Sequence, residues 1–254
     1  MLPTELPLYF CGIPFRAYQV GRKLRWLLAR GEIRQVMRGV YVAIRVPDCP
    51  ALRADSLRLV VPPDAVVRGR AAAWPHGIDT TALSPEPTIS PQWTFHPCPT
   101  VEVLGLKVIS PAATAIELAQ HLDRPFALSA VDALLHSEVV TRQQLETASA
   151  AYFSEHSKSQ GRQIITYADR RAASPGESWL RLRLLDAGFG VPELQVRVDG
   201  PSRVYRLDLG YPERVVDGRR LGLEYDSDQW HSSSRQQVRD ETRRAELERS
   251  WAGT

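Results

Sequence analysis

Four acidic residues in the last third of this 254-residue chain could carry out chemistry together. Glu177 lies in a predicted helix, Asp208 in a predicted strand, and Glu224 and Asp226 in the strand after it. Carboxylates held close together repel one another unless one is protonated or a cation lies between them. A hard divalent cation such as Mg²⁺ or Mn²⁺ prefers carboxylates, waters and phosphate oxygens. We therefore predict a metal site held by Glu177, Asp208 and Glu224, with Asp226 assisting.

The predicted strands explain how these acids would meet. Successive side chains of a strand point to opposite faces, so Leu207 and Leu209 are expected on the face opposite Asp208. The apolar residues of the next strand are likewise expected opposite its two acids. Each strand would then offer an apolar face to a helix layer and an acidic face to a common point. The predicted order is a helix, three strands and a charged helix over Arg235–Arg249.

The same acids also have a structural interpretation. Ser174 and Glu177, three residues apart and followed by a helical pattern, form a capping-box sequence that would by itself explain the glutamate. Asp208 is equally interpretable as an ordinary solvent-facing strand residue. Against the capping interpretation, Glu177 shares a helical stripe with Leu180 and Leu184, which is an inward-facing place for an acid.

The segment SPGESW to DQWH, residues 174–231, resembles the PD-(D/E)xK nuclease superfamily, specifically its branch similar to the very-short-patch-repair (Vsr) endonucleases. The resemblance implies a restriction-endonuclease-like αβββα core that hydrolyses DNA phosphodiesters with a metal ion. It assigns Glu177 as the helix acid and Asp208 as the first strand acid. Glu224 and Asp226 match the pair that ends the motif.

Two further site residues are assigned by this resemblance alone. Gln195 matches a glutamine that the branch often places on its first strand, and His231 matches a histidine that commonly follows the core strand. This histidine is a candidate to activate water or protonate the leaving group, because imidazole titrates near neutral pH. It is also interpretable as a loop histidine. Asp226 stands where the superfamily has a lysine, which leaves open what activates the water.

The first fifty residues are rich in basic side chains. The stretch GRKLRWLLARG predicts a helix from its leucine spacing, ended by Gly31. The following IRQVMRGVYV predicts two short strands joined by a turn at Met37–Gly39. Helices followed by a basic hairpin are typical of a winged helix-turn-helix, with one helix for the major groove and a wing near the backbone. The candidate DNA contacts are Arg22, Lys23, Arg25, Arg34 and Arg38.

Residues 8–48, and LLARGEIRQVMRGVYV above all, resemble the N-terminal winged-helix domain of AbiEi-type antitoxins of type IV toxin–antitoxin systems. The resemblance implies DNA binding, often at the protein's own promoter, and a cognate toxin as a partner. The alternative is a small α/β module whose arginines form a solvated face.

The middle of the chain predicts a mixed region with a strand pair around Gly105 and helices capped by Ser110 and Thr141. The polar stretch at residues 154–163 predicts a flexible boundary. In the nuclease-like family the last helix leads into a further strand that this sequence lacks, so the C-terminal domain is expected to be truncated. We expect three domains: a winged helix at 1–50, a mixed α/β region with a helical connector at 51–168, and the nuclease-like domain at 169–254.

The overall composition fits a soluble globular protein, with 43% hydrophobic and 24% charged residues and a net charge of +3. No apolar run is long enough to span a membrane, and the proline-broken start lacks the basic segment of a signal peptide. The three cysteines are far apart and form neither a disulfide framework nor a zinc motif. We therefore expect a cytoplasmic protein without a membrane partner.

These patterns together favour an α/β (α+β) protein with an N-terminal winged helix-turn-helix, a helical middle region and a nuclease-like C-terminal core. The main functional hypothesis is a Mg²⁺-dependent DNA endonuclease that the winged helix directs to DNA. The alternative is a DNA-binding transcriptional repressor or antitoxin that does not cleave, which the missing lysine and the missing strand favour.

Overall fold

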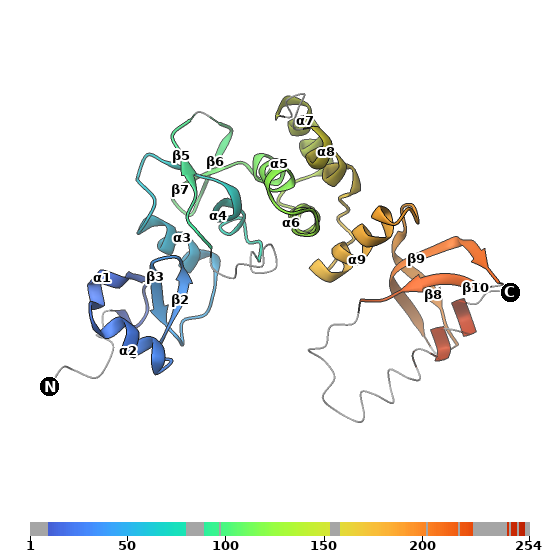
Figure 1. The fold of residues 1–254 in the computed structure, drawn as a ribbon, viewed down its shortest axis with the longest axis horizontal. Coiled ribbons are helices and arrows are strands. Elements are labelled where there is room, and N and C mark those ends of the chain that lie inside the picture. Colours follow the sequence, from blue (N-terminus) through green and yellow to red (C-terminus); the bar gives the residue numbers. More distant parts are fainter. Residues whose placement is uncertain are drawn as a thin grey trace.

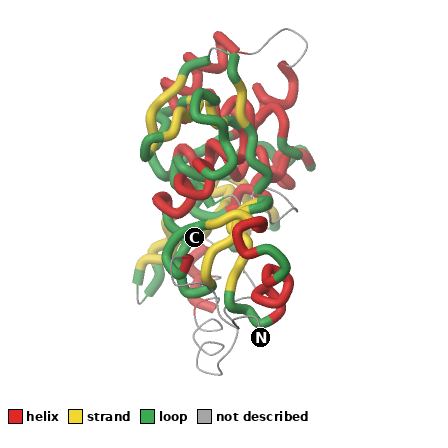
Figure 2. The backbone as a smooth tube through the Cα atoms, turned by 90° about the vertical axis from the view of Figure 1, so that its left-hand side faces the viewer, coloured by secondary structure: helices red, strands yellow, loops and turns green. Residues whose placement is uncertain are grey.

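The computed structural model describes residues 10–79, 89–96, 98–152, 158–201, 203–217, 219–225, 243, 245–247 and 249–251. Within these residues three small sheets follow one another along the chain, and a group of helices lies between the second sheet and the third (Figures 1 and 2). The predicted mixed α/β class is confirmed. Within the described residues, no helix is both long and apolar enough to cross a bilayer.

The first sheet is built with two short helices. The elements are β1 (Phe15–Arg16), α1 (Ala17–Val20), α2 (Lys23–Ala29), β2 (Ile33–Met37) and β3 (Val40–Ala43). The strands lie in the antiparallel order β1-β3-β2. Helix α2 packs Leu27 against Phe15 and Ile33. The chain turns at Gly31, as predicted, because its φ of +67° lets its N–H donate to the carbonyl of Leu28 at 3.0 Å.

Strands β2 and β3 form the predicted hairpin, with its turn at Arg38 and Gly39. Gly39 has a φ of +81°, a conformation that side-chain-bearing residues rarely adopt. Met37 and Val40, which flank the turn, are fully buried in a core that they share with the second sheet. The backbone N–H of Arg38 also donates to the carbonyl of Ile89 at 2.9 Å. The hairpin is therefore attached to the middle of the molecule.

The second sheet has the strand order β5-β4-β7-β6. Its region contains α3 (Pro50–Arg58), β4 (Val66–Val67), α4 (Gly69–Ala73), β5 (Trp93–Thr94), β6 (Thr100–Val103) and β7 (Leu106–Ile109). Strands β4 and β7 run parallel, and the other neighbouring pairs run antiparallel. β6 and β7 are the predicted pair around Gly105, whose φ is +76°. Ala71–Ala73 are fully buried, because their small side chains let α4 approach its neighbours closely.

Four helices pack around the largest apolar core. They are α5 (Pro111–His121), α6 (Arg124–His136), α7 (Arg142–Tyr152) and α8 (Lys158–Tyr167). Leu128 and Ile164 are fully buried between them. Ser110 and Thr141 cap α5 and α7 as predicted, since each hydroxyl accepts from the N–H three residues ahead at 3.2 Å.

The predicted flexible boundary at residues 154–163 is wrong over its second half. Residues 153–157 lie outside the described part of the chain, but residue 158 already begins α8. The side-chain amide of Gln160 donates to the carbonyls of Ala119 at 3.1 Å and Leu122 at 2.8 Å. The polar residues of this stretch therefore belong to a helix, and one of them, Gln160, caps the end of α5.

The third sheet follows the predicted order of a helix and three strands. The elements are α9 (Pro175–Asp186), β8 (Glu193–Asp199), β9 (Val204–Val216) and β10 (Arg219–Leu223), with the antiparallel strand order β10-β9-β8. Of the predicted helix over Arg235–Arg249, the described residues 243, 245–247 and 249 are helical, as are 250 and 251. Leu247 and Trp251 pack against Val196 and Leu207 of the sheet.

The predicted alternation of faces is confirmed in β9, where Leu207 and Leu209 are buried, Arg206 is exposed and Asp208 is half-buried, but it is not followed in β10. Leu209 packs with Leu184 of α9, whereas Leu207 packs in a different cluster with Leu247. Leu221, expected on the apolar face, is 41% exposed. β10 ends at Leu223, so Glu224 follows the strand and does not lie within it. The third sheet thus packs against two apolar clusters, and the departure from period-two patterning is confined to β10, where the register shifts between Arg220 and Leu221.

Candidate functional site

Three of the four predicted acids come together around Asp208. Burial raises the pKa of this carboxyl, and the neighbouring charges of Glu177 and Glu224 raise it further. The backbone N–H of Tyr225, which donates to Asp208 Oδ2 at 2.7 Å, and the nearby Arg243 guanidinium act in the opposite direction. The convergence predicted from the sequence is therefore present for these three. The predicted site residues Asp226 and His231 lie outside the described residues.

Glu177 satisfies parts of both sequence interpretations. Its backbone N–H donates to Ser174 Oγ at 3.2 Å, as in the predicted cap of α9. Glu177 is only 7% exposed, and its carboxylate points into the protein interior. Glu177 Oε2 accepts from the N–H of Ala173 at 3.0 Å and from the side-chain amide of Gln195 at 3.1 Å. Gln195, which the family resemblance assigns to the site, is thus hydrogen-bonded directly to one of the acids.

Gln195 occupies an unusual backbone conformation. Its φ is +53° although it lies inside β8, where extended values are the rule. The neighbouring register pairs, Leu194 with Leu209 and Val196 with Leu207, place it opposite Asp208. A left-handed conformation costs a residue with a side chain about 1–3 kcal/mol and persists only where its surroundings enforce it. No pattern in the sequence indicates this strain.

Glu224 is engaged by an arginine that sequence reasoning did not place here. Both guanidinium Nη atoms of Arg243 bind the two carboxylate oxygens of Glu224, one to each. Arg243 also donates to the carbonyl of Arg206 at 3.4 Å. Because the partners are nineteen positions apart, no local spacing rule could have found the pair.

The described carboxylates do not fit the predicted Mg²⁺ or Mn²⁺ site. Among the residues that the structure describes, no three His, Cys, Asp or Glu side chains are grouped so that they could hold a metal ion. Glu177 and Asp208 accept hydrogen bonds from amide N–H groups, and Glu224 binds a guanidinium cation. Hydrogen-bond donors of the protein, one of them the Arg243 guanidinium, therefore contact these acids.

A buried ion pair joins this site to the helices of the middle region. Asp132 of α6 and Arg181 of α9 are each 1% exposed, and Asp132 Oδ2 accepts from Arg181 and from Ser178 Oγ at 2.6 Å. The N–H of Asp169 donates to Asp132 Oδ1 at 2.8 Å. Burial raises the pKa of Asp132, and these partners act against that rise. Since Ser178 follows Glu177 directly, the pair fixes the helix that presents the acid.

Some of the residues predicted to contact DNA have no side-chain partner among the described residues, whereas one is hydrogen-bonded. Arg22 and Lys23 lie at the start of α2 and Arg25 follows; Arg22 and Arg25 are exposed and Lys23 is partly exposed. Within the described part of the chain, these three make no side-chain hydrogen bond or ion pair, and neither does exposed Arg38 at the hairpin turn. Arg34 differs, because its guanidinium donates to the carbonyl of Val46 at 2.9 Å.

Aromatic side chains accompany the free cations. Tyr18 of α1 is 77% exposed and Trp26 of α2 is 37% exposed. The guanidinium of Arg30 lies 4.6 Å from the ring centroid of Trp26, within the range of a cation–π contact. The surface formed by α1 and α2 is therefore both basic and aromatic.

The comparisons with known proteins concern mainly the middle of the chain. Residues 95–163 match the AbiEi antitoxin C-terminal domain. This stretch runs from the end of β5 into α8. The predicted AbiEi resemblance is therefore supported, but over residues 95–163 and not over residues 8–48, where we had located it. Neither the Vsr-like nuclease domain nor the winged helix receives support from these comparisons.

Two relatives extend the similarity without adding a function. Uncharacterized proteins of Mycobacterium tuberculosis strains CDC 1551 / Oshkosh and ATCC 25618 / H37Rv are each 37% identical over 147 residues. The matched stretch covers 58% of this chain and 52% of each relative, so it spans about half the length of these curated proteins. No solved structure matches this chain.

Proposed function

We propose that this protein is a DNA-binding repressor of the antitoxin type, with its DNA-reading surface on α1, α2 and the β2–β3 hairpin. The observation that carries the proposal is the group of free cations at the start of α2. Arg22, Lys23 and Arg25 project from one short helix without partners among the described residues. Such side chains are available for phosphate oxygens, and arginine is suited to bidentate phosphate contacts.

The arrangement of this region supports a winged helix-turn-helix. The order strand, two helices and hairpin would let α2 enter the major groove while the hairpin lies along the backbone. Arg38 is exposed at the turn of the hairpin, where a wing would meet a phosphate. The burial of Met37 and Val40 in the neighbouring core would hold the wing at a fixed position relative to α2.

The antitoxin part of the proposal rests on the match over residues 95–163. An antitoxin implies a cognate toxin, so we include a toxin as the proposed partner, with the protein's own promoter as the proposed DNA target. In this proposal the first fifty residues read DNA, and the middle region carries the antitoxin function.

The first test is a DNA-binding titration by fluorescence anisotropy with duplex DNA from upstream of the protein's own reading frame. The variant Arg22→Ala/Lys23→Ala/Arg25→Ala removes the free cations of α2. The matched control Lys107→Ala/Arg162→Ala/Arg183→Ala removes the same charges from exposed positions elsewhere. The proposal predicts that the α2 variant loses affinity by at least about tenfold, or about 1.4 kcal/mol, while the control stays close to wild type. Equal losses in both variants would contradict it.

A second candidate function, a DNA endonuclease, is favoured by the convergence of Glu177, Asp208 and Glu224. In this reading these acids, with Asp226, Gln195 and His231, form the hydrolytic site proposed from the sequence. The described groups do not fit a metal ion, so we derive no metal-dependent step. The repressor proposal predicts no cleavage of duplex or single-stranded DNA by the wild type, with or without Mg²⁺ or Mn²⁺. Cleavage that Glu224→Ala abolishes while DNA affinity stays unchanged would favour the endonuclease.

A further inference from the structure

Trp26 lies in the middle of the exposed face of α2. The residues of this face are spaced as on one stripe of a helix, and all of them are exposed: Arg22, Arg25, Trp26 and Ala29. On the opposite side of the helix, Leu27 is fully buried in the core of the first sheet. The tryptophan ring is therefore placed among the cations that are proposed to contact phosphates.

Two neighbouring side chains hold the ring of Trp26 in place. Glu32 Oε1 accepts from Arg30 Nε at 2.8 Å. The Arg30 guanidinium in turn lies 4.6 Å from the centroid of the Trp26 ring, within the range of a cation–π contact. One face of the ring is thus covered by an arginine that is itself paired with a carboxylate. A side chain that is already ordered loses less conformational freedom when it binds a ligand.

The side chains of this face are suited to two different parts of a DNA duplex. Arginine side chains contact phosphate oxygens, which position a protein on DNA but carry no sequence information. An apolar side chain in the major groove can contact the 5-methyl group of thymine, which distinguishes thymine from the other bases. Trp26 is the largest side chain of the face, and Ala29 beside it is small. The ring can therefore approach a base edge without obstruction from this neighbour.

We infer that Trp26 is a specificity-determining residue, whose ring contacts thymine methyl groups of duplex DNA in the major groove. The inference rests on the proposed DNA-reading function and adds the chemical feature that α2 recognises. The cations supply affinity for any duplex, and the tryptophan supplies discrimination among sequences. The ligand class is therefore duplex DNA with thymine at the position that α2 faces.

A thermodynamic cycle between the ring and the methyl group tests the inference. Fluorescence anisotropy measures the affinity of the full chain for the duplex from upstream of its own reading frame, synthesised with thymine or with uracil, which lacks only the methyl group. Wild type is expected to bind the uracil duplex about fourfold or more weakly, the value expected for one buried methyl group. Trp26→Ala should bind the two duplexes equally. Trp26→Phe, which keeps an aromatic ring, should retain a preference for thymine.

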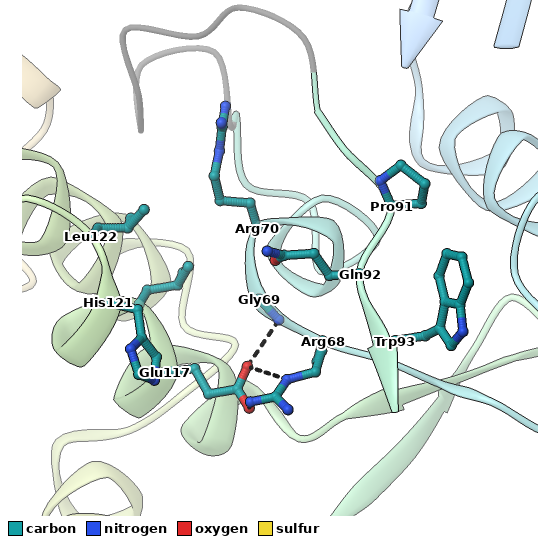
Figure 3. Close-up of a pocket in the computed structure, with 10 residues that line it drawn as sticks. Arg68, Gly69, Arg70, Pro91, Gln92, Trp93, Glu117, His121 and Leu122 are labelled. Carbon is teal, nitrogen blue, oxygen red and sulfur yellow. Dashed lines mark hydrogen bonds and ion pairs between the residues drawn. The ribbon is translucent and has the colours of Figure 1, made fainter. Parts of the chain in front are cut away.

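Two control variants separate the ring from other contributions. Trp93→Ala removes a tryptophan of matched exposure, 38% against 37% for Trp26. Trp93 lines a pocket of about 510 Å³ beside β5 and the end of α5 (Figure 3), so its loss should leave the wild-type ratio of thymine to uracil affinity. The Arg22/Lys23/Arg25 triple alanine variant should bind both duplexes more weakly and keep that ratio. Thermal melts establish that each variant is folded.

The outcomes distinguish this inference from the proposed function. Equal affinity of wild type for the two duplexes, or a preference for thymine that folded Trp26→Ala retains, would overturn the inference while DNA binding through the cations still stands. A triple variant that binds DNA as tightly as wild type does would instead contradict the proposed function. Absence of DNA binding by wild type would overturn both.

Discussion

Asp132 and Arg181 show how a single buried pair determines where a helix lies. Both side chains are almost fully buried, and the carboxylate also accepts from Ser178 and from the N–H of Asp169. Removing one partner of such a pair leaves a buried charge without compensation, which costs more than the pair itself contributes. The pair therefore ties α9, and with it Glu177, to the helices of the middle region.

Asp132→Ala is predicted to lower the free energy of unfolding by about 3–5 kcal/mol, because it strands the Arg181 guanidinium inside the protein. Urea denaturation monitored by circular dichroism measures the change. Asp199→Ala is the matched control, since Asp199 pairs with Arg197 at the surface, with 72% and 68% of the side chains exposed. Loss of that exposed pair should change stability by no more than about 0.5 kcal/mol. Similar losses in both variants would show that burial of the pair is unimportant.

The raised pKa of Asp208 is predicted to make the stability of the protein depend on pH. Burial, with the charges of Glu177 and Glu224, raises the pKa of Asp208 in the folded protein above that in the unfolded chain. The folded state then binds the proton more tightly, so the stability that this group contributes falls as the pH rises through its folded pKa. The ionised carboxylate is therefore unfavourable for the fold at neutral pH.

Asp208→Asn is accordingly predicted to be more stable than wild type at pH 7. An asparagine carbonyl can still accept from the N–H of Tyr225, so the change removes mainly the charge. The advantage should disappear as the pH falls below the ordinary range of aspartate. Denaturation series at several pH values, with exposed Asp199→Asn as the control, provide the measurement. A variant less stable than wild type at every pH would show that the ionised carboxylate supports the fold.

At the scale of elements, the sequence was sufficient to predict those turns and helix caps that depend only on neighbouring residues. The hairpins at Gly39 and Gly105 follow from glycine at positions that require positive φ. The caps at Ser110 and Thr141 follow from hydroxyls placed before apolar helical patterns. In each case the residues that determine the structure lie within a few positions of one another, so one sequence is enough to predict it.

Contacts between segments that are far apart in the sequence could not be predicted from the same local patterns. Gln160, in a polar stretch, donates to backbone carbonyls at the end of α5, and these partners lie about forty residues away in the sequence. The Glu224–Arg243 pair and the positive φ of Gln195 likewise depend on how segments meet. Three of the acids expected near one point, Glu177, Asp208 and Glu224, lie near one another, but the sequence could not show that amide N–H groups and a guanidinium would bind them.

The helical residues near the end of the chain pack against the third sheet at Gly222. A Cβ at Gly222 of β10 would lie 2.6 Å from Leu207 Cδ1 and 3.2 Å from Trp251 Nε1. Gly222→Ala is predicted to lower the free energy of unfolding by about 1–3 kcal/mol through overpacking of this cluster. Gly12→Ala is the control, because nothing lies within 4 Å of its added Cβ. Equal stability of the two variants in a urea titration would mean that an added methyl group at Gly222 does not overpack this cluster.

At the scale of the whole molecule, neighbouring units share elements. The hairpin residues Met37 and Val40 belong to the core of the second sheet. Helix α9 lies between the group of helices and the third sheet (Figure 1). It contributes Leu182 to the core of the four helices and Leu184 to the core under the third sheet. The proposed DNA surface, the AbiEi-like middle region and the acidic cluster are therefore connected by packed structure. The net charge of +3 is mild, so DNA binding depends on where the cations lie.

The salt dependence of DNA binding tests the central proposal most directly. Each phosphate contact contributes about 0.9 to the slope of log K against log salt concentration. If Arg22, Lys23 and Arg25 contact phosphates, the triple alanine variant should have a slope shallower than wild type by about 2–3. The Lys107/Arg162/Arg183 control should keep the wild-type slope. Identical slopes for wild type and the α2 variant would contradict the proposal that α2 reads DNA.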